Sequence, residues 1–265
     1  MTNMNEYFAG DKLYGDDFKL EQLREWYEDE VEGYANLGAK NRASYRYVYH
    51  ALNYYHGFKY IQKKIINSAL GIGSAYGDEF KPILKNIKQI TILDHQSFVQ
   101  DECYGIPCKY IKPSVDGKMP FEGNSFDLIT CLGVLHHIPN VSFVMSEVHR
   151  CLAKNGLVLI REPIVSMGDW TKPRKGGTKR ERGIPIGIFN QINQQVGFKV
   201  LHSGFCVFRP LSGVCRLLGV NAYNNKLLTC LDAFLCKITN RNTVYHPEGF
   251  CQKFQPSSIF YVLIK

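Results

Sequence analysis

A glycine-rich turn follows a short apolar segment near residue 70. The small residues of this turn are, in order, Gly71, Gly73, Ser74, Ala75 and Gly77. Because such residues have little bulk, a nucleotide-like ligand can approach the backbone closely. Asp94 ends the next apolar run, 17 residues after Gly77, and a carboxylate at a strand end can accept two hydrogen bonds from a ribose diol. Together these features favour a nucleoside-containing ligand.

Other ligands fit this turn less well. A dinucleotide fingerprint, G-x-G-x-x-G, needs a glycine where Tyr76 stands, and a phosphate-binding P-loop needs a Gly-Lys-Ser/Thr that this turn lacks. An NAD-dependent oxidoreductase is therefore disfavoured. Two plainer readings stay open: an ordinary tight turn between a strand and a helix, and an Asp94 that only caps the next helix.

A second group of reactive side chains comes from later segments. His136 and His137 follow one apolar run, and Glu162 and Asp169 follow the next. His137, Glu162 and Asp169 are candidates for a general base that takes a proton from a hydroxyl acceptor. A histidine in such a place is also common as a packing residue. No third His, Cys or acid has a convincing metal-ligand spacing, so the sequence predicts no metal site.

Four segments, taken in order, resemble the class I S-adenosylmethionine-dependent methyltransferases. The segments are 68–77, 90–94, 120–138 and 152–163, and the strongest match is Ser-Phe-Asp, an apolar run and then Leu-His-His-Ile-Pro in 125–139. The resemblance covers residues 65 to 164 well and the rest more loosely. It implies S-adenosylmethionine as the cofactor and S-adenosylhomocysteine as the product. It also implies methyl transfer by in-line displacement, for which the enzyme supplies mainly proximity and orientation.

The resemblance also implies roles for individual residues. Gly71 stands where the family usually has an acid, which normally orders the loop near the amino group of the cofactor. Asp94 would bind the ribose and Asp116 the adenine amine, while Cys131 and Leu132 would lie beside the methionine portion. The implied cofactor set is Gly71, Gly73, Ser74, Ala75, Gly77, Asp94, His95, Asp116, Cys131 and Leu132.

The acceptor is expected at a basic, glycine-rich segment, 164–184. Trp170 can stack on a sugar or an aromatic ring, and an arginine can bind a carboxylate or phosphate in bidentate fashion; the expected acceptor residues are Trp170, Arg174, Arg180 and Arg182. The sequence of this segment resembles, more weakly, that of methyltransferases of bacterial surface-glycan biosynthesis. That resemblance implies O-methylation of an anionic sugar, a sugar nucleotide or a lipid-linked glycan. A small aromatic or lipid acceptor and a non-catalytic binding protein of the same fold are the alternatives.

These residues must be positioned by an α/β framework. Strand and helix patterns alternate between 65 and 163, which predicts a doubly wound, mostly parallel sheet; the resemblance implies seven strands. We expect an N-terminal helical cap at 1–64 and a methyltransferase domain at 65–265. The domain is expected to carry a basic loop at about 164–184 and a helical insertion at about 211–245. A helix is predicted at 186–196 and strands at 198–207 and 258–264.

Composition bounds the remaining possibilities. The chain has 265 residues, a net charge of +8 and nine scattered cysteines without a C-x-x-C pair, which favours reduced thiols in a cytoplasmic protein. No N-terminal signal peptide is recognisable, and no motif for nucleic-acid binding appears despite the basic charge. An apolar face at 227–238 predicts core packing, a homodimer contact or shallow association with the inner face of a membrane.

Overall fold

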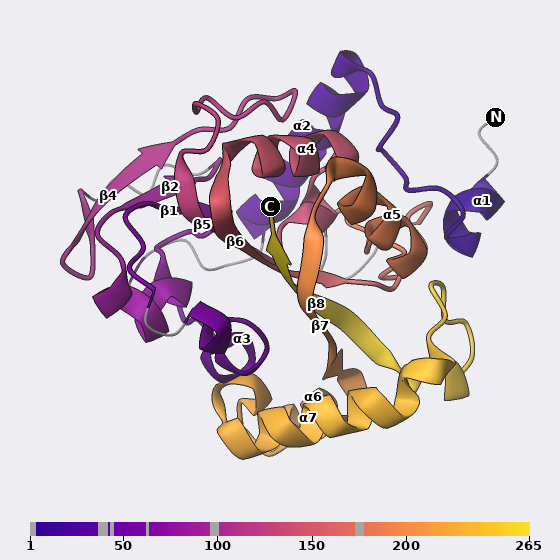
Figure 1. Ribbon diagram of the computed structural model, residues 1–265. Helices are drawn as coiled ribbons and strands as arrows, with labels where there is room; N and C mark the ends of the chain where they lie inside the picture. The colour runs from indigo at the N-terminus through magenta and orange to yellow at the C-terminus, as the bar shows by residue number, and fades with distance from the viewer. Residues whose placement is uncertain (1–3, 37–41, 43–44, 62–63, 96–100, 173–177) are drawn as a thin grey trace.

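A computed structural model describes residues 4–36, 42, 45–61, 64–95, 101–172 and 178–265. Within these ranges the strands form one eight-stranded sheet in the order β3-β4-β2-β1-β5-β6-β8-β7 (Figure 1). The strands are β1 (Ala69–Ile72), β2 (Ile90–Leu93), β3 (Glu102–Cys103), β4 (Ile106–Ile111), β5 (Phe126–Leu132), β6 (Leu152–Pro163), β7 (Lys199–Phe208) and β8 (Pro256–Ile264).

The helices are grouped along the chain before, within and after the parallel strands. The α-helices are α1 (Met4–Ala9), α2 (Leu20–Asn36), α3 (His50–His56), α4 (Val141–Cys151), α5 (Ile186–Val196), α6 (Arg209–Leu217) and α7 (Lys226–Thr239). The 3₁₀ segments are η1 (Phe58–Ile61), η2 (Asp78–Asn86), η3 (Leu135–His137), η4 (Ala222–Asn224), η5 (Asn240–Asn242) and η6 (Cys251–Lys253). Helix α5 has the predicted bounds, whereas α1 was not predicted.

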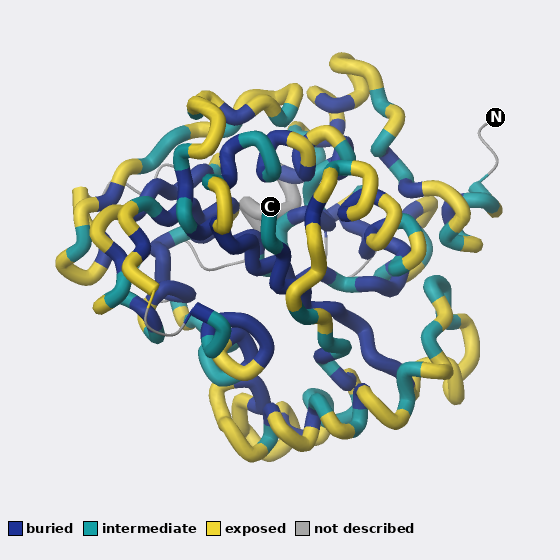
Figure 2. Tube along the Cα trace, in the orientation of Figure 1, coloured by how far each residue is buried: buried dark blue, intermediate teal, exposed yellow. Residues whose placement is uncertain are grey.

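The centre of the sheet is parallel and buried. β1 pairs in parallel with β2 and β5, and β5 pairs in parallel with β6. Each residue of β1 and β2 is buried, as expected for apolar strands that are covered on both faces. The dark sheet beneath the lighter helices is visible in Figure 2. The carboxyl ends of these strands therefore meet at one edge, where ligands of open α/β sheets bind.

The end of the chain completes the sheet with antiparallel pairs. β8 inserts between β6 and β7 and runs antiparallel to both. The fold is the Rossmann-like methyltransferase fold, as predicted. The expected number of seven strands was one too low, because the two-residue strand β3 pairs with β4 at the edge of the sheet. The division into a cap at 1–64 and a domain at 65–265 stays a prediction.

Candidate functional site

The glycine turn lies at the carboxyl end of β1. Gly73 has a φ of +61°, and a Cβ there would come within 2.6 Å of the Val134 side chain. A glycine is therefore required at 73 by both conformation and space. The amide of Gly73 donates to the Leu93 carbonyl at 2.8 Å, which ties the turn to the end of β2. The turn is thus held between the ends of two strands, with Val134 against it.

Gly71 has a separate steric reason to be glycine. A Cβ at this position would lie 2.3 Å from the Ser74 Oγ. The Ser74 side chain therefore fills the space into which a side chain at 71 would project. This explains how the turn closes without the acid that was noted as missing from the sequence.

A buried carboxyl group stands close to that position. Glu79, in η2, is almost completely buried, and its Oε1 lies 3.5 Å from the hydroxyl of Thr130. Thr130 is the register partner of Gly71 in the neighbouring strand β5. Burial raises the pKa of Glu79 to about 7, with a hydrogen bond to Ser74 opposing the shift. Sequence reasoning missed Glu79 because it follows the glycine turn instead of preceding it.

Asp94 lies at the carboxyl end of β2, beside the turn. Its Oδ2 accepts the amide hydrogen of Ala75 at 3.0 Å, which fixes the carboxylate against the glycine loop. His95 follows it and packs its ring against Tyr27 with centroids 4.8 Å apart. Gly77 is the left-handed residue that starts η2. The predicted residues at the first two strand ends are therefore brought together.

The remaining predicted cofactor residues come from the next two segments. Asp116 is exposed, and its carboxylate accepts the amide hydrogen of Lys118 at 3.0 Å, which closes a turn. The Asn140 side chain holds the Asp116 carbonyl at 2.8 Å. Cys131 is buried near the end of β5, where burial raises the pKa of its thiol, and Leu132 is half-buried.

A cluster of histidines and acids follows β5, in η3. His136 Nδ1 lies 2.7 Å from Glu162 Oε2, and His136 Nε2 lies 3.3 Å from Glu181 Oε1. His137 Nδ1 lies 2.8 Å from Glu30 Oε2, and the two imidazole rings are 4.0 Å apart. The acids come from β6, from helix α2 and from the segment before α5. Three distant parts of the chain therefore meet at one histidine pair.

The pKa values of the two histidines are shifted in opposite directions. Burial lowers the pKa of His136, but its hydrogen bonds to Glu162 and Glu181 outweigh burial and raise it to about 9. Burial, with the neighbouring charge of His136, lowers the pKa of His137 below its ordinary value. His137 is thus neutral near pH 7 and keeps the protonation state that a general base needs.

The other two candidate bases are less suited to proton abstraction. Glu162 is fully buried and accepts the backbone hydrogens of Val134 and Leu135 at 2.8 and 2.9 Å. Although burial opposes ionisation, these bonds and His136 lower the pKa of Glu162. Asp169 is paired with Lys172 at 2.8 Å, which lowers its pKa. Glu162 therefore holds η3 in place, and Asp169 lies in a separate exposed ion pair.

The residues expected to bind the acceptor are engaged in contacts within the protein. Arg182 is fully buried and donates to the carbonyls of Tyr14, Leu135, His136, Ile138 and Pro139. Arg180 pairs with Asp29 of α2, as does its neighbour Lys179. Trp170 is buried, stacks on Phe8 with centroids 4.5 Å apart and donates to the Ser166 carbonyl. Arg174 lies outside the described residues.

Cationic and aromatic side chains pack together beside Leu132. The guanidinium of Arg161 donates to Asn53 at 2.9 Å and to the Leu132 carbonyl at 3.2 Å, and it lies 3.8 Å above the Tyr49 ring. The Asn53 amide in turn donates to the Tyr47 hydroxyl at 2.5 Å. No site role was predicted from the sequence for Tyr47, Tyr49 or Asn53. The only available signal was the tyrosine-rich run before 56.

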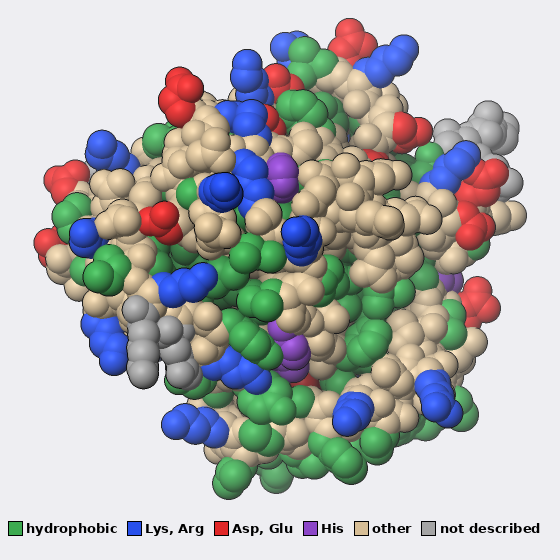
Figure 3. Space-filling model, viewed as in Figure 1, with side chains coloured by type: hydrophobic (Ala, Val, Ile, Leu, Met, Phe, Trp, Pro, Cys, Tyr) green, Lys and Arg blue, Asp and Glu red, His purple; other side chains and the backbone are tan. Residues whose placement is uncertain are grey.

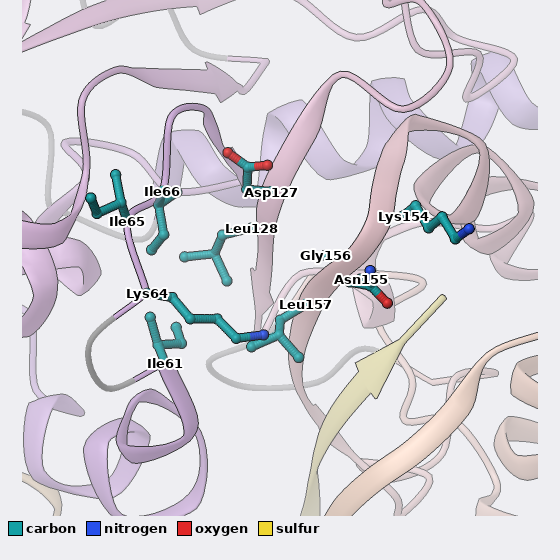
Figure 4. Close-up of a pocket in the computed structure, with 10 residues that line it drawn as sticks. All are labelled: Ile61, Lys64, Ile65, Ile66, Asp127, Leu128, Lys154, Asn155, Gly156 and Leu157. Atoms are coloured by element: carbon teal, nitrogen blue, oxygen red, sulfur yellow. The ribbon is translucent and has the colours of Figure 1, made fainter.

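A cavity elsewhere in the molecule is not part of this site. Its volume is about 220 Å³, and it lies where β5 begins, around Asp127 and Leu128, with Asn155 and Gly156 on its other side (Figure 4). The glycine turn lies where the strands end. Asp127 there accepts the amide hydrogen of Asn67 at 2.7 Å, so it braces the start of the sheet.

The comparisons with known proteins agree with this geometry. A methyltransferase-domain family matches residues 70–160, the part of the chain that carries the turn, Asp94 and the histidines. A search of curated proteins finds no significant match.

Several solved structures have the same fold. A methyltransferase of Leishmania major is 12% identical, with a TM-score of 0.58 over 93% of this chain and 86% of that one. One from Archaeoglobus fulgidus is 13% identical, with a TM-score of 0.51 over 81% and 91%. A phosphoethanolamine N-methyltransferase of Haemonchus contortus, solved with S-adenosylhomocysteine, is 14% identical with a TM-score of 0.55. The similarity covers 81% of this chain and 52% of that one. At these low sequence identities, the similarity to the solved structures establishes the fold alone.

The fold, the matched domain and the cradle at the strand ends together define the class of protein. The chain is a class I S-adenosylmethionine-dependent methyltransferase, and S-adenosylmethionine is its cofactor. The predicted enzyme class and cofactor are confirmed.

Proposed function

We propose that this enzyme methylates a hydroxyl oxygen of a glycan or glycan precursor that binds beside the histidine pair. The observation that carries the proposal is the contact between Gly73 of the cofactor turn and Val134, which stands two residues before His136. The cofactor and the histidine pair therefore share one edge of the sheet. His137, held by Glu30 and neutral near pH 7, takes the proton as the oxygen attacks the methyl group.

The same proposal assigns Glu79 the role of the absent acid at position 71. Its carboxyl group is buried beside Ser74 and Thr130, next to the register position of Gly71. A cationic ammonium group of the cofactor stabilises a carboxylate there and lowers its raised pKa. Asp94 binds the ribose diol, and the exposed Asp116 marks the adenine end.

The acceptor is anionic and lipid-linked in this proposal. Arg180 and Arg182 are engaged in contacts within the protein, so the support comes from a different surface. Helices α6 and α7, and the residue that follows α6, expose apolar side chains, namely Val214, Leu217, Leu218, Leu227, Phe234 and Ile238. Between residues 210 and 247 the sequence has one acid, Asp232, and that residue is fully buried. The exposed cations of this stretch are Arg216, Lys226, Lys237 and Arg241.

Apolar side chains interspersed with cations suit an anionic lipid surface. Hydrophobic and basic side chains alternate along the lower edge of the molecule over α6 and α7 (Figure 3). None of the helices in the described part of the chain is long and apolar enough to cross a bilayer. Docking through α6 and α7 would bring the enzyme to an acceptor anchored in the membrane.

Two experiments test this function. The first offers labelled S-adenosylmethionine with sugar nucleotides, lipid-linked sugars and small phenols; label on a sugar hydroxyl supports the proposal, and label only on phenols favours the aromatic alternative. The second measures co-sedimentation with phosphatidylglycerol and phosphatidylcholine vesicles. We expect binding to the anionic vesicles alone, lost in Leu217→Ser/Leu227→Ser. Equal binding by that variant, or a dimer that hides these residues, would contradict the membrane surface.

A further inference from the structure

Three ligand-type atoms converge at the histidine pair. His136 Nε2 lies 3.3 Å from Glu181 Oε1, and His137 Nε2 lies 3.9 Å from the same oxygen. One ligand atom from each of these three residues falls within 4.8 Å of the other two. The side chains are between 10% and 15% exposed, so the group is largely shielded but still reaches solvent.

The opposite nitrogen of each imidazole faces its own carboxylate. Glu162 lies at His136 Nδ1 and Glu30 at His137 Nδ1, at 2.7 and 2.8 Å. A carboxylate accepts a hydrogen, so each contact places a proton on Nδ1. When the imidazole is neutral, its Nε2 lone pair then faces Glu181. This carboxylate–histidine arrangement is the one that usually orients metal-ligating histidines.

We propose that His136 Nε2, His137 Nε2 and the Glu181 carboxylate bind one divalent transition-metal ion, with zinc as its best representative. Two imidazoles and one carboxylate are a ligand set used by catalytic zinc and by mononuclear iron sites. Ligand atoms about 2.0–2.2 Å from a tetrahedral ion are about 3.4 Å apart. The two spacings from Nε2 to Glu181 Oε1, 3.3 and 3.9 Å, lie near this value, and side-chain rotations close the remainder. The remaining coordination positions stay open to water or to an acceptor oxygen. An ion bound there occupies His137 Nε2, so His137 takes the acceptor proton, as proposed above, only in the ion-free protein.

The sequence predicted no metal because the third ligand lies far along the chain. Glu181 is brought to the histidines by the segment before α5, which Arg182 fixes to the carbonyls of η3. Glu181 is itself held, since its other oxygen accepts the Thr178 amide hydrogen at 3.0 Å. A proton on His136 Nε2, donated to Glu181 as a hydrogen bond, would compete with the metal ion. The proton and the ion cannot both occupy this nitrogen.

The ion binds to the chain alone, so its test is independent of methyl transfer. The full-length protein, stripped with a chelator, is titrated with ZnCl₂ by calorimetry and with CoCl₂ by visible absorption. We expect one tight equivalent of zinc and cobalt bands typical of nitrogen and oxygen ligands. Glu181→Gln and His137→Ala should weaken zinc binding by roughly a hundredfold or more, and Glu30→Gln by roughly ten- to a hundredfold, as outer-shell carboxylates do.

Three controls keep the outcome readable. His149→Ala removes a histidine outside the cluster and should bind zinc like the parent protein. Far-ultraviolet circular dichroism checks that each variant is folded, and S-adenosylmethionine titration in chelator shows whether the cofactor site is intact. A sulfur-to-cobalt charge-transfer band would indicate cysteine ligands, such as Cys103 and Cys108, whose Sγ atoms are 3.0 Å apart. Such a band, or unchanged zinc affinity in folded Glu181→Gln, would overturn the proposal.

Discussion

At the scale of single residues, Asp94 is the side chain whose removal should cost the most cofactor affinity. Its carboxylate is placed at the glycine turn by the Ala75 amide. Two hydrogen bonds from a ribose diol to a charged group are worth on the order of 3 kcal/mol or more. We expect Asp94→Ala to weaken S-adenosylmethionine binding by at least about a hundredfold in calorimetry.

Asp127→Ala is the matched control for that measurement. Asp127 is also a carboxylate that binds backbone amides, but at the opposite end of the sheet. Its loss should lower stability and leave cofactor affinity near normal. Near-normal affinity in Asp94→Ala would instead remove the ribose assignment.

The role proposed for Glu79 separates two parts of the cofactor. Glu79→Gln should weaken binding of S-adenosylhomocysteine by about tenfold, because the amide cannot neutralise the ammonium group. Binding of methylthioadenosine, which has no ammonium group, should be unchanged. An equal loss for both ligands would mean that Glu79 supports only the shape of the turn.

At the scale of elements, Arg182 joins its own segment to three other parts of the chain. Its guanidinium bonds to Tyr14 and to the η3 segment, and it lies 5.2 Å from the Trp26 ring of α2. Arg182→Ala would leave several buried carbonyls without partners, at about 1–3 kcal/mol each before relaxation. We expect a loss of roughly 3–5 kcal/mol in the free energy of unfolding, measured with urea.

Arg180→Ala is the matched comparison, because Arg180 also contacts helix α2. Its partners Asp29 and Glu25 belong to α2, and its side chain is only partly buried. Solvent still reaches this pair, whose side chains are 19% and 14% exposed, so we expect a smaller loss, on the order of 1 kcal/mol. If Arg180→Ala destabilised the protein as much as Arg182→Ala, the special role of the buried guanidinium would be refuted.

At the scale of the whole molecule, two buried groups should make stability fall as pH rises. Glu79 has a folded pKa of about 7 against an ordinary 4.5, and His136 one of about 9 against 6.5. In both cases the folded state holds the proton more tightly, so stability is lost from about pH 4.5 to 7 for Glu79 and from 6.5 to 9 for His136. Each contribution is at most on the order of 3 kcal/mol.

Urea unfolding in chelator at a series of pH values checks this expectation. The decline above pH 7 should flatten in His136→Gln, and the decline below pH 7 should flatten in Glu79→Gln. Stability of the parent protein that rises above pH 7 would contradict the His136 assignment. Below pH 7 the lowered pKa of His137 acts in the opposite direction, so the Glu79 assignment is contradicted if Glu79→Gln and the parent protein show the same pH dependence.

The framework could be predicted from the sequence further than the site could. Helix α5 and the last strands were predicted from local apolar spacing, because burial repeats along each element. The fates of Arg180 and Trp170 could not be predicted, since periodicity does not say which distant charges or rings meet. Asp29 and Arg180 are 151 residues apart and still form an ion pair. The same limit hid Glu181 from the histidines.

The contact between Gly73 and Val134 has a thermodynamic consequence. The glycine turn, proposed to bind the cofactor, touches the segment that carries both histidines, so a shift of one displaces the other. If cofactor binding tightens the grip on an ion or acceptor at the histidines by some factor, then that ion or acceptor must tighten cofactor binding by the same factor. Each ligand can therefore be titrated with and without the other, and both titrations should give the same coupling factor. The size of this factor would measure how strongly bound methyl donor raises the affinity of the enzyme for its acceptor.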